Sequence, residues 1–479
     1  MTFTLHRFTM NLFWLFFVFL FILPTSNAKS FYADPVTDKG TFSPEYKTKF
    51  LKNSNILNKL LAEKYNLTYT PDEVITENIK SNEELKPMEN PYLFEGDIIL
   101  NDEQWEVYIE NAREDLRSRQ ISKNESPSMN PKKRVIMSDP KYRWTFPIPF
   151  HINSTLNANL IMSVIKRYEQ ETCVRFKRQN QLPADKYILG LEIIKGTGCW
   201  SYVGKQRIRQ QVSIGIGCES VGTIWHEIAH ALGVYHEQSR YDRDKYILIN
   251  PQNVIKDDIH NFEKQSADST SDYGIGYDYG SVMHYDTYAF SKNNQPTMMV
   301  RDPIYTDTPG TYFGPSFGDV KGINAAYCSS TCSNTLRCVN GGYINPSNCN
   351  GCNCPPGFGG KLCEVKANPG SCGNVNLMAI SNTQKINAAG KKTCYFLITA
   401  PAGRRVFFKV TDSEFRSSIY SPCTSNYLEI FYKQDFTKSG ARTCFSYRPL
   451  PINLSEGELL LVMYQGDEGS HFSMDYRAA

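Results

Sequence analysis

The spacing of the cysteines is the feature that most restricts how this chain can fold. Fourteen cysteines occur in 479 residues, and none precedes Cys173. An even number of cysteines confined to part of a chain is typical of disulfides formed in an oxidising compartment. They form one dispersed set, one dense set and a second dispersed set: Cys173, Cys199, Cys218 and Cys328; Cys332, Cys338, Cys349, Cys352, Cys354 and Cys363; Cys372, Cys394, Cys423 and Cys444. The chain therefore divides into a cysteine-free region and three disulfide-bearing regions.

The start of the chain has the order of a secretory signal peptide. His6 and Arg7 precede an unbroken apolar run, residues 12–23, which is followed by Pro24 and by small residues ending at Ala28. The run is too short for a membrane-spanning helix, which needs roughly 18 apolar residues. We expect a signal peptide over residues 1–28, a secreted, extracellular protein and no membrane span. The net charge of +3, from 52 basic and 49 acidic residues, excludes the electrostatic pattern of a nucleic-acid partner.

Residues 29–134 are predicted to be a propeptide. The region has no cysteine, and its apolar periodicity predicts helices at 50–61 and 103–116. The tribasic Lys132-Lys133-Arg134 follows a stretch rich in Pro and Ser, where an exposed chain suits cleavage by an activating protease at Arg134. A solvated run of charges is the alternative. Four sequons are possible glycosylation sites in a secreted protein: Asn66, Asn124, Asn153 and Asn453.

Residues 135–330 read as an α+β domain. Strand-like runs at 146–151, 187–194 and 210–216 alternate with a helix around 160–168 and another that begins near Val221. The second helix carries the segment from His226 to His236, which contains three of the eight histidines.

This histidine segment predicts a catalytic metal site. On a helix, His226 and His230 lie four residues apart on one face, so two imidazoles can bind one ion. Glu227 projects beside them, as a general base requires. Gly233 can adopt positive φ and turn the chain so that His236 reaches the same ion. Three nitrogen ligands with an open position are typical of catalytic zinc, although a bare HExxH is also found in ordinary helices.

The segment His226–His236 resembles the metzincin clan of zinc proteases, and its continuation to Asp244 resembles the astacin family within that clan. Residues 281–285, Ser-Val-Met-His-Tyr, match the astacin Met-turn, and the likeness spans residues 135–328. It implies a two-lobed protease domain, Met283 as an apolar floor under the metal, and Tyr285 as a further zinc ligand that can stabilise the oxyanion. It also implies the disulfides Cys173–Cys328 and Cys199–Cys218.

The same resemblance explains the propeptide. Phe94-Glu95-Gly96-Asp97 matches the F-x-G-D motif of astacin propeptides, in which the Asp is the inhibitory zinc ligand of the zymogen. Taken alone, a Gly-Asp pair is more often a plain turn. Cleavage after Arg134 would make Val135 the mature N-terminus, and the family habit buries its ammonium group against Glu237.

Residues 331–364 resemble an EGF-like domain. Six cysteines in so short a stretch indicate a disulfide-rich module rather than one held by a core. Fifteen pairings are possible, and the sequence does not choose among them. The family habit implies Cys332–Cys349, Cys338–Cys352 and Cys354–Cys363.

Residues 372–479 resemble a CUB domain, an all-β sandwich. Alternating runs at 405–410, 427–432 and 459–464 predict strands, and the closing segment 472–476 fits the same family. The family would pair Cys372 with Cys394 and Cys423 with Cys444. Many CUB domains bind calcium through an Asp before the Tyr at 427. Here Asn426 stands in that place and only Asp467 matches, which disfavours Ca²⁺.

The sequence thus predicts a secreted, zymogen-type zinc endopeptidase with EGF-like and CUB domains, acting on extracellular proteins such as matrix or precursor proteins. One alternative is an adhesion protein in which the protease fold is an inert scaffold. The intact ligands and Glu227 argue against it. An exopeptidase is disfavoured because no recognition of a chain terminus is visible in the sequence.

Overall fold

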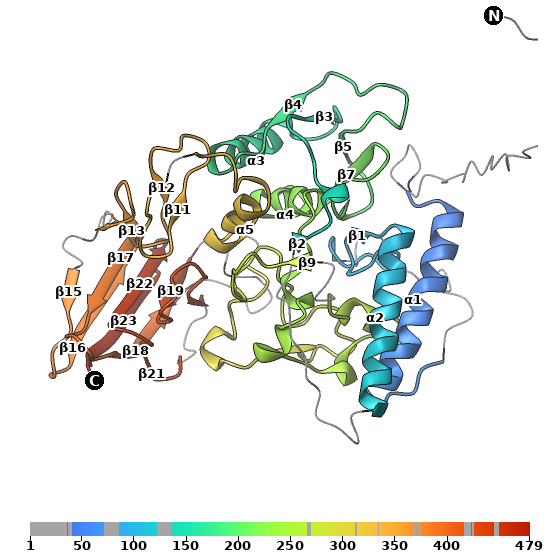
Figure 1. The fold of residues 1–479 in the computed structure, drawn as a ribbon. Coiled ribbons are helices and arrows are strands. Elements are labelled where there is room, and N and C mark those ends of the chain that lie inside the picture. The colour runs from blue at the N-terminus through green and yellow to red at the C-terminus, as the bar shows by residue number, and fades with distance from the viewer. Residues whose placement is uncertain are drawn as a thin grey trace, which may run out of the picture.

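The computed structural model describes most of the chain after residue 40. The described residues are 36, 41–70, 86–121, 136–265, 270–311, 314–333, 335–367, 372, 376–415, 423, 426–444 and 450–479. The predicted signal peptide, Asn124, the basic residues 132–134 and Val135 lie outside them. The structure has four parts, which we call the helical layer (41–121), the central region (136–328), the cysteine-rich module (332–366) and the C-terminal sandwich (376–478). The helical layer and the sandwich lie at opposite ends of the central region (Figure 1).

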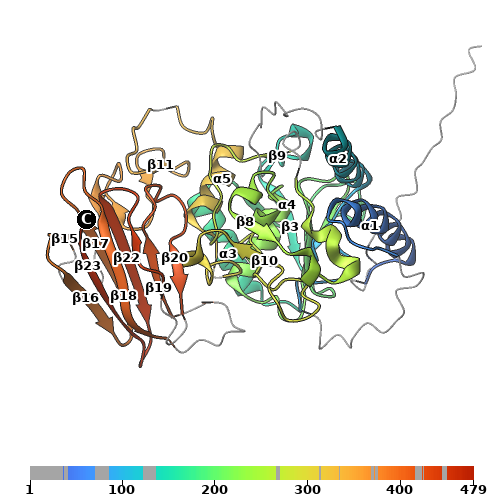
Figure 2. The ribbon, with the colours of Figure 1, turned by 90° about the horizontal axis from the view of Figure 1, so that it is seen from below.

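The helical layer consists of α1 (Pro44–Lys64) and α2 (Asp102–Ile121), which contain both helices predicted in this part of the sequence. Ser43 caps α1 by accepting a hydrogen bond from the Tyr46 N–H at 3.2 Å, and Pro44 occupies the first turn. The two helices lie side by side against the central region in both ribbon views (Figures 1 and 2). Lys64 joins them to that region, since its Nζ lies 2.8 Å from Asp115 and 3.3 Å from Glu263.

A six-stranded sheet forms one half of the central region. Its order is β1-β6-β7-β5-β3-β4, and only β6 and β7 are antiparallel neighbours. The strands are β1 (Ile98–Ile99), β3 (Ile148–Ile152), β4 (Phe176–Arg178), β5 (Leu191–Ile194), β6 (Cys199–Tyr202) and β7 (Gln210–Ile214). The edge strand β1 belongs to the predicted propeptide. Helices α3 (Ala158–Glu171) and α4 (Val221–Ala231) share a buried apolar core with this sheet.

The strand predicted at 187–194 is wrong in its first half. Only Leu191–Ile194 is a strand, while Tyr187 and Ile188 are 67% and 45% exposed. Asp185 explains the difference, because its carboxylate accepts from the Tyr187 N–H at 2.9 Å and its carbonyl accepts from the Ile188 N–H at 3.1 Å. These local bonds form a turn that competes with the ladder.

The other half of the central region is built from short elements. They are β2 (Ile136–Met137), β8 (Ile247–Ile249), β9 (Thr270–Ser271) and β10 (Met298–Val300), and the 3-10 turns η1 (Pro140–Tyr142), η2 (Glu237–Ser239), η3 (Arg243–Lys245), η4 (Pro251–Asn253), η5 (Lys256–Phe262) and η6 (Pro303–Tyr305). The region closes with α5 (Phe317–Tyr327), which begins at a capping box formed by Ser316 and Asp319.

The cysteine-rich module consists of two small hairpins packed on the central region. Their strands are β11 (Tyr343–Ile344) with β12 (Cys352–Asn353), and β13 (Phe358–Gly359) with β14 (Val365–Lys366). The Tyr343 ring lies 5.4 Å from the Phe317 ring of α5, and its hydroxyl is 3.1 Å from Asn324 Nδ2. The module is therefore docked by both apolar and polar contacts.

The C-terminal sandwich has two facing sheets, as predicted. The first has the order β15-β17-β22-β19-β20 and the second β16-β23-β18-β21. The strands are β15 (Asn376–Met378), β16 (Gln384–Ala389), β17 (Lys392–Thr399), β18 (Val406–Glu414), β19 (Tyr427–Phe431), β20 (Ala441–Thr443), β21 (Asn453–Leu454), β22 (Leu459–Gly466) and β23 (His471–Ala478). Alternate residues of β23 are buried, as expected for a strand with one face on a core.

Seven disulfides join the cysteines in the pairs that the resemblances implied. They are Cys173–Cys328, Cys199–Cys218, Cys332–Cys349, Cys338–Cys352, Cys354–Cys363, Cys372–Cys394 and Cys423–Cys444. The first ties the end of α5 to the residues after α3. Among the described residues, no helix combines the length and apolarity needed to cross a bilayer.

Candidate active site

The site begins on α4, which presents two of the three predicted histidine ligands. Ser220 caps this helix, since its hydroxyl accepts from the Thr223 N–H at 3.0 Å. His226 and His230 lie one turn apart and are completely buried, and their ring centroids are 4.5 Å apart. The spacing of four residues places both rings on one face, as predicted.

Gly233 ends the helix and brings in the third histidine. Its φ is +97°, and its N–H donates to the His230 carbonyl at 2.7 Å. The chain then reverses, so that His236 Nε2 lies 3.1 Å from His226 Nε2. The predicted role of Gly233 is therefore the one that its backbone performs.

Each imidazole is oriented through its Nδ1 atom. His226 Nδ1 lies 2.8 Å from the Val282 carbonyl and His230 Nδ1 lies 2.7 Å from the Val234 carbonyl. These carbonyls fix the tautomer that leaves Nε2 as the electron-pair donor. Burial, then the neighbouring His226, lowers the pKa of His230 to about 3, which keeps this ring in the neutral form that binds metals.

Asp97 of the helical layer completes the ligand set. Its Oδ2 lies 3.1 Å from His236 Nε2 and 3.3 Å from His226 Nε2, and its Oδ1 lies 3.7 Å from His230 Nε2. One donor atom from each of the four side chains falls within a cluster 4.8 Å across. Burial opposes the charge on Asp97, but the three imidazoles outweigh it and hold its pKa well below the usual range.

This donor set fits zinc. Three imidazole nitrogens and one carboxylate oxygen are ligands that tetrahedral zinc accepts. Within the described part of the chain, His230 Nε2 and Asp97 Oδ1 are buried without a hydrogen-bond partner. Such atoms are costly to bury unless an ion satisfies them, so the polar centre is arranged for a cation.

Glu227 follows the first histidine ligand on α4. It is fully buried, and among the described residues neither of its carboxylate oxygens has a hydrogen-bond partner. Burial, followed by the nearby charge of Asp97, raises the pKa of Glu227 well above its ordinary value. A buried carboxylate with free lone pairs beside a metal site is suited to exchange a proton.

The backbone around Asp97 requires the glycine of the F-x-G-D motif. Gly96 has a φ of +77°, and a Cβ there would lie 2.4 Å from the Met88 carbonyl oxygen. Phe94 anchors the other side of the motif, because its ring packs on Trp105 and Tyr108 of α2 at 5.4 and 4.4 Å. The segment is thus shaped to deliver Asp97 to the histidines.

Glu95, the variable position of the motif, is a functional residue that sequence reasoning missed. It is fully buried with a φ of +50°, and its Oε2 lies 2.6 Å from His236 Nδ1. Its Oε1 accepts a short hydrogen bond from the Ser239 hydroxyl, and its N–H donates to Asn261 Oδ1 at 2.7 Å. No spacing rule pointed to this residue, since its partners come from segments more than 140 residues away.

Tyr285 lies beside the third histidine, and Met283 contacts the residue that follows it. The Tyr285 ring lies 4.8 Å from the His236 ring, and its hydroxyl donates to the Glu95 carbonyl at 2.5 Å. In this structure the hydroxyl is therefore held by the helical layer. Met283 is buried, and its carbonyl accepts from the Glu237 N–H at 2.8 Å.

Glu237 occupies a buried position directly after the third histidine. Its Oε1 accepts from the Asp278 N–H at 2.8 Å and from Arg240 Nη1 at 3.3 Å. Burial raises its pKa to about 8 in spite of the Arg240 charge. Ile136, at the start of the central region, forms a bridge to Val234, three residues before Glu237.

Two histidines to which the sequence assigned no role have distinct surroundings. His284 Nε2 lies 2.7 Å from the Tyr277 hydroxyl, a structural contact. His260 faces the helical layer: its N–H donates to Asn58 Oδ1 at 2.8 Å, and its ring packs 5.7 Å from that of Phe50.

The remaining predicted sites lie away from this centre. Asn66 is exposed, and Asn153 and Asn453 are half-buried. In the sandwich, Asp467 already accepts from Asn426 Nδ2 at 2.7 Å and from the Ser470 hydroxyl at 2.5 Å. Internal donors thus occupy both oxygens of the one predicted calcium ligand.

Known proteins resemble this chain over the region that holds the site. Residues 136–328 match the model of the peptidase family described as Astacin. Zinc metalloproteinase nas-34 of Caenorhabditis elegans is 48% identical over 469 residues, which cover 97% of this chain and 77% of nas-34. The chain belongs to the astacin family. This astacin is therefore a zinc metalloproteinase, a hydrolase of peptide bonds.

Other relatives cover smaller shares. Zinc metalloproteinase nas-30 of C. elegans is 36% identical over 379 residues, which are 77% of this astacin but 48% of nas-30, so the chain spans about half the length of that relative. Among solved structures, the hatching enzyme zinc-protease HCE-1 of the medaka Oryzias latipes is 31% identical. It covers 40% of this astacin and 98% of its own chain, with a TM-score of 0.36.

Proposed function

We propose that this astacin is a secreted endopeptidase of extracellular proteins, made as a zymogen, in which Glu227 is the general base. The observation that carries the proposal is the convergence of His226, His230, His236 and Asp97 on one centre with an unpartnered Glu227 beside it. The apolar run at residues 12–23 and the seven disulfides support secretion.

In the zymogen, the helical layer blocks the site. Asp97 takes the position among the three histidines that a catalytic water needs, and the Glu95 carbonyl holds the Tyr285 hydroxyl. Strand β1 also pairs with β6 along the sheet edge, with Ile98 opposite Ser201. Removal of the layer by cleavage after Arg134 frees all three positions at once.

In the processed enzyme, the three histidines would hold zinc, which would supply Lewis-acid chemistry at the centre between them. Glu227 accepts the proton of that water and delivers a proton to the leaving amine. Tyr285, released from the Glu95 carbonyl, donates a hydrogen bond to the oxyanion. Glu237 receives the ammonium group of the new N-terminus, Val135, and so couples cleavage to ordering of the site.

The test compares the secreted full-length chain, processed after Arg134, with two variants on a denatured generic protein. Glu227→Ala should lose activity by about 10²-fold or more and still bind one zinc per chain. Glu219→Ala, at an exposed position just before α4, is the matched control and should retain activity. A correctly processed, zinc-loaded wild type that cleaves nothing would favour a scaffold role instead.

A further inference from the structure

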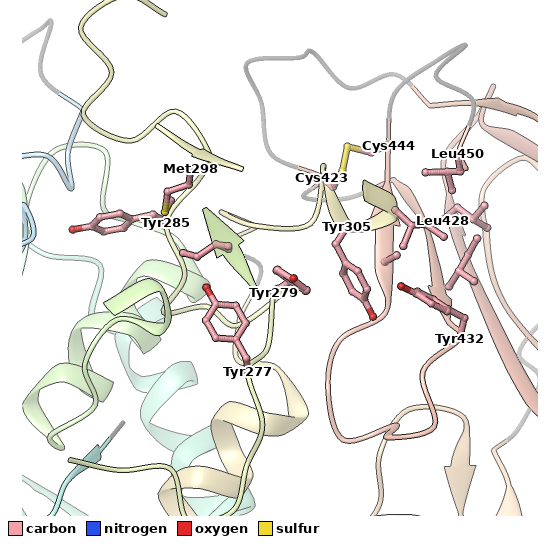
Figure 3. Close-up of a cluster of buried hydrophobic side chains, with 14 of the residues drawn as sticks. Tyr277, Tyr279, Tyr285, Met298, Tyr305, Cys423, Leu428, Tyr432, Cys444 and Leu450 are labelled. Carbon is pink, nitrogen blue, oxygen red and sulfur yellow. A yellow bond between two sulfur atoms is a disulfide. The ribbon is translucent and has the colours of Figure 1, made fainter. Parts of the chain in front are cut away.

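The C-terminal sandwich is not a free appendage, because its β20 edge is buried against the central region. A row of aromatic rings crosses the boundary: Tyr277, Tyr279 and Tyr305 come from the central region, and Tyr432 from the sandwich (Figure 3). Successive ring centroids are 5.4, 4.7 and 5.8 Å apart. All four tyrosines are at most 8% exposed. The row makes a continuous apolar seam between the two parts.

Buried polar contacts flank this seam. The Arg442 N–H donates to the Thr308 hydroxyl at 2.9 Å, and Arg442 Nη1 donates to the Thr311 hydroxyl at 2.7 Å. Both threonines are at most 1% exposed, and Arg442 also pairs with buried Glu429 at 3.2 Å. Undocking would remove the donors that the Thr308 and Thr311 hydroxyls have in this arrangement.

One contact leads from the sandwich to the active site. The Ser439 N–H of the sandwich donates to Asp278 Oδ1 at 3.0 Å. The Asp278 N–H in turn donates to Glu237 Oε1 at 2.8 Å, and Glu237 follows the third histidine. Asp278 is 3% exposed, and its other oxygen has no hydrogen-bond partner among the described residues. Asp278 Oδ1 thus accepts from Ser439 of the sandwich and, at 3.0 Å, from the Gly280 N–H of the central region, while the Asp278 N–H donates to Glu237.

We propose that the C-terminal sandwich is rigidly docked on the central region, and that Ser439 positions Asp278 and, through it, Glu237. Asp278 is a positioning residue, since it touches neither the substrate nor the ligand cluster. The effect on the active site rests on the proposed function, in which Glu237 receives the new N-terminus. The docking of the sandwich does not depend on that role of Glu237.

Two glycines offer a matched pair of variants. A Cβ on Gly280 would lie 2.5 Å from Ser439 Cβ and Oγ, so Gly280→Ala pushes Ser439 away from Asp278. A Cβ on Gly276 would meet only the far end of the Lys438 side chain, 2.3 Å from Nζ, which can swing aside. Gly276→Ala is therefore the control. Ser439→Pro tests the same hydrogen bond to Asp278 by a change in the sandwich, because proline has no N–H to donate.

The experiment uses full-length, processed, zinc-loaded protein and three readouts. Small-angle scattering reports docking, kinetics on a short peptide separate kcat from KM, and an amine-reactive label reports exposure of the mature N-terminus. We expect Gly280→Ala and Ser439→Pro to lower kcat about fivefold with KM unchanged, the effect of one lost buried hydrogen bond. Labelling of the N-terminus should rise, and Gly276→Ala should match the wild type.

Three results would overturn the proposal. A wild type with an extended scattering profile would refute docking. The link through Asp278 would be refuted if the Gly280→Ala protein were undocked and still had the kcat and N-terminal labelling of Gly276→Ala. It would also be refuted if Gly280→Ala and Ser439→Pro both had the kcat and labelling of the wild type. Failure of the proposed function looks different, because the wild type would then be compact and inactive.

Discussion

His236 Nδ1 lies 2.6 Å from Glu95 Oε2, although 141 residues separate them in the chain. The other two histidines are oriented by backbone carbonyls of the central region, whereas the third is oriented by a carboxylate of the helical layer. The layer thus contacts this ligand from two sides, through Asp97 at Nε2 and Glu95 at Nδ1. Loss of the layer changes the surroundings of the third ligand more than those of the first two.

Glu95→Ala should loosen the helical layer without removing the Asp97 ligand. The substitution leaves His236 Nδ1 and the Ser239 hydroxyl buried without their carboxylate partner, which costs about 1.5–3 kcal/mol for bonds to a charged group. We expect Glu95→Ala to lower the Tm of the unprocessed chain. The measurement is made in a Glu227→Ala background, which prevents self-cleavage. Glu106→Gln, on the exposed face of α2, is the control. Equal Tm values for the two would show that the Glu95 contact does not hold the layer.

Gly96→Ala should weaken the same segment for a steric reason. Its Cβ would collide with the Met88 carbonyl in addition to straining the backbone at positive φ. Gly274 has the same φ of +77° but open space around its Cβ, so Gly274→Ala isolates the backbone strain of about 1 kcal/mol. The unprocessed Gly96→Ala chain should be cut at the layer more quickly by added trypsin. A cleavage rate equal to that of Gly274→Ala would contradict the steric argument.

Tyr285→Phe should act in opposite directions on the two forms. In the unprocessed chain it removes the hydrogen bond to the Glu95 carbonyl, which should ease release of the layer. In the processed enzyme it removes a donor to the oxyanion, which should lower kcat by about 10²-fold with little change in KM. Steady-state kinetics on one peptide measure both parameters. An unchanged kcat would exclude the oxyanion role.

Because His260 is buried against the helical layer, we expect the unprocessed chain to lose stability as the pH falls. Burial lowers the pKa of His260 to about 4, against roughly 6.5 in the unfolded chain. Because the folded-state pKa is depressed, the stability from keeping this ring neutral is complete above pH 6.5 and is lost as the pH falls toward 4. The loss amounts to about 3 kcal/mol.

His260→Gln keeps a donor for Asn58 but does not titrate, so its Tm should fall less than that of the wild type between pH 6.5 and 4. Other buried histidines titrate in both proteins, and the difference between the two curves isolates His260. Parallel curves would show that burial by the layer does not depress the folded-state pKa of His260.

Zinc removal should destabilise the processed enzyme more than the unprocessed chain. In the processed form the three imidazoles lose their common partner, while in the unprocessed form Asp97 still accepts from His236 Nε2 at 3.1 Å. Calorimetry before and after a chelator, with zinc then restored, measures both shifts. A larger loss of Tm in the unprocessed chain would contradict this ordering.

The sequence by itself determined the parts of this protein whose chemistry is local. The spacing of His226, His230 and His236 fixes a helix face followed by a reversal at Gly233, because helical periodicity and positive φ act over a few residues. Apolar alternation likewise predicted the longer strands β18, β19 and β22 of the sandwich. The prediction of a strand at 187–194 was partly wrong, because the turn at Asp185 competes with the hydrogen bonds between strands.

Only the tertiary structure decided how distant segments meet. Glu95 reaches His236, and Ser439 reaches Asp278, across gaps of 141 and 161 residues. Neither contact follows from propensity or period, since each depends on how whole units pack and on which buried polar groups must then be satisfied. The three histidine ligands thus come from one short segment, while the contacts that orient and block them come from the packing of distant segments.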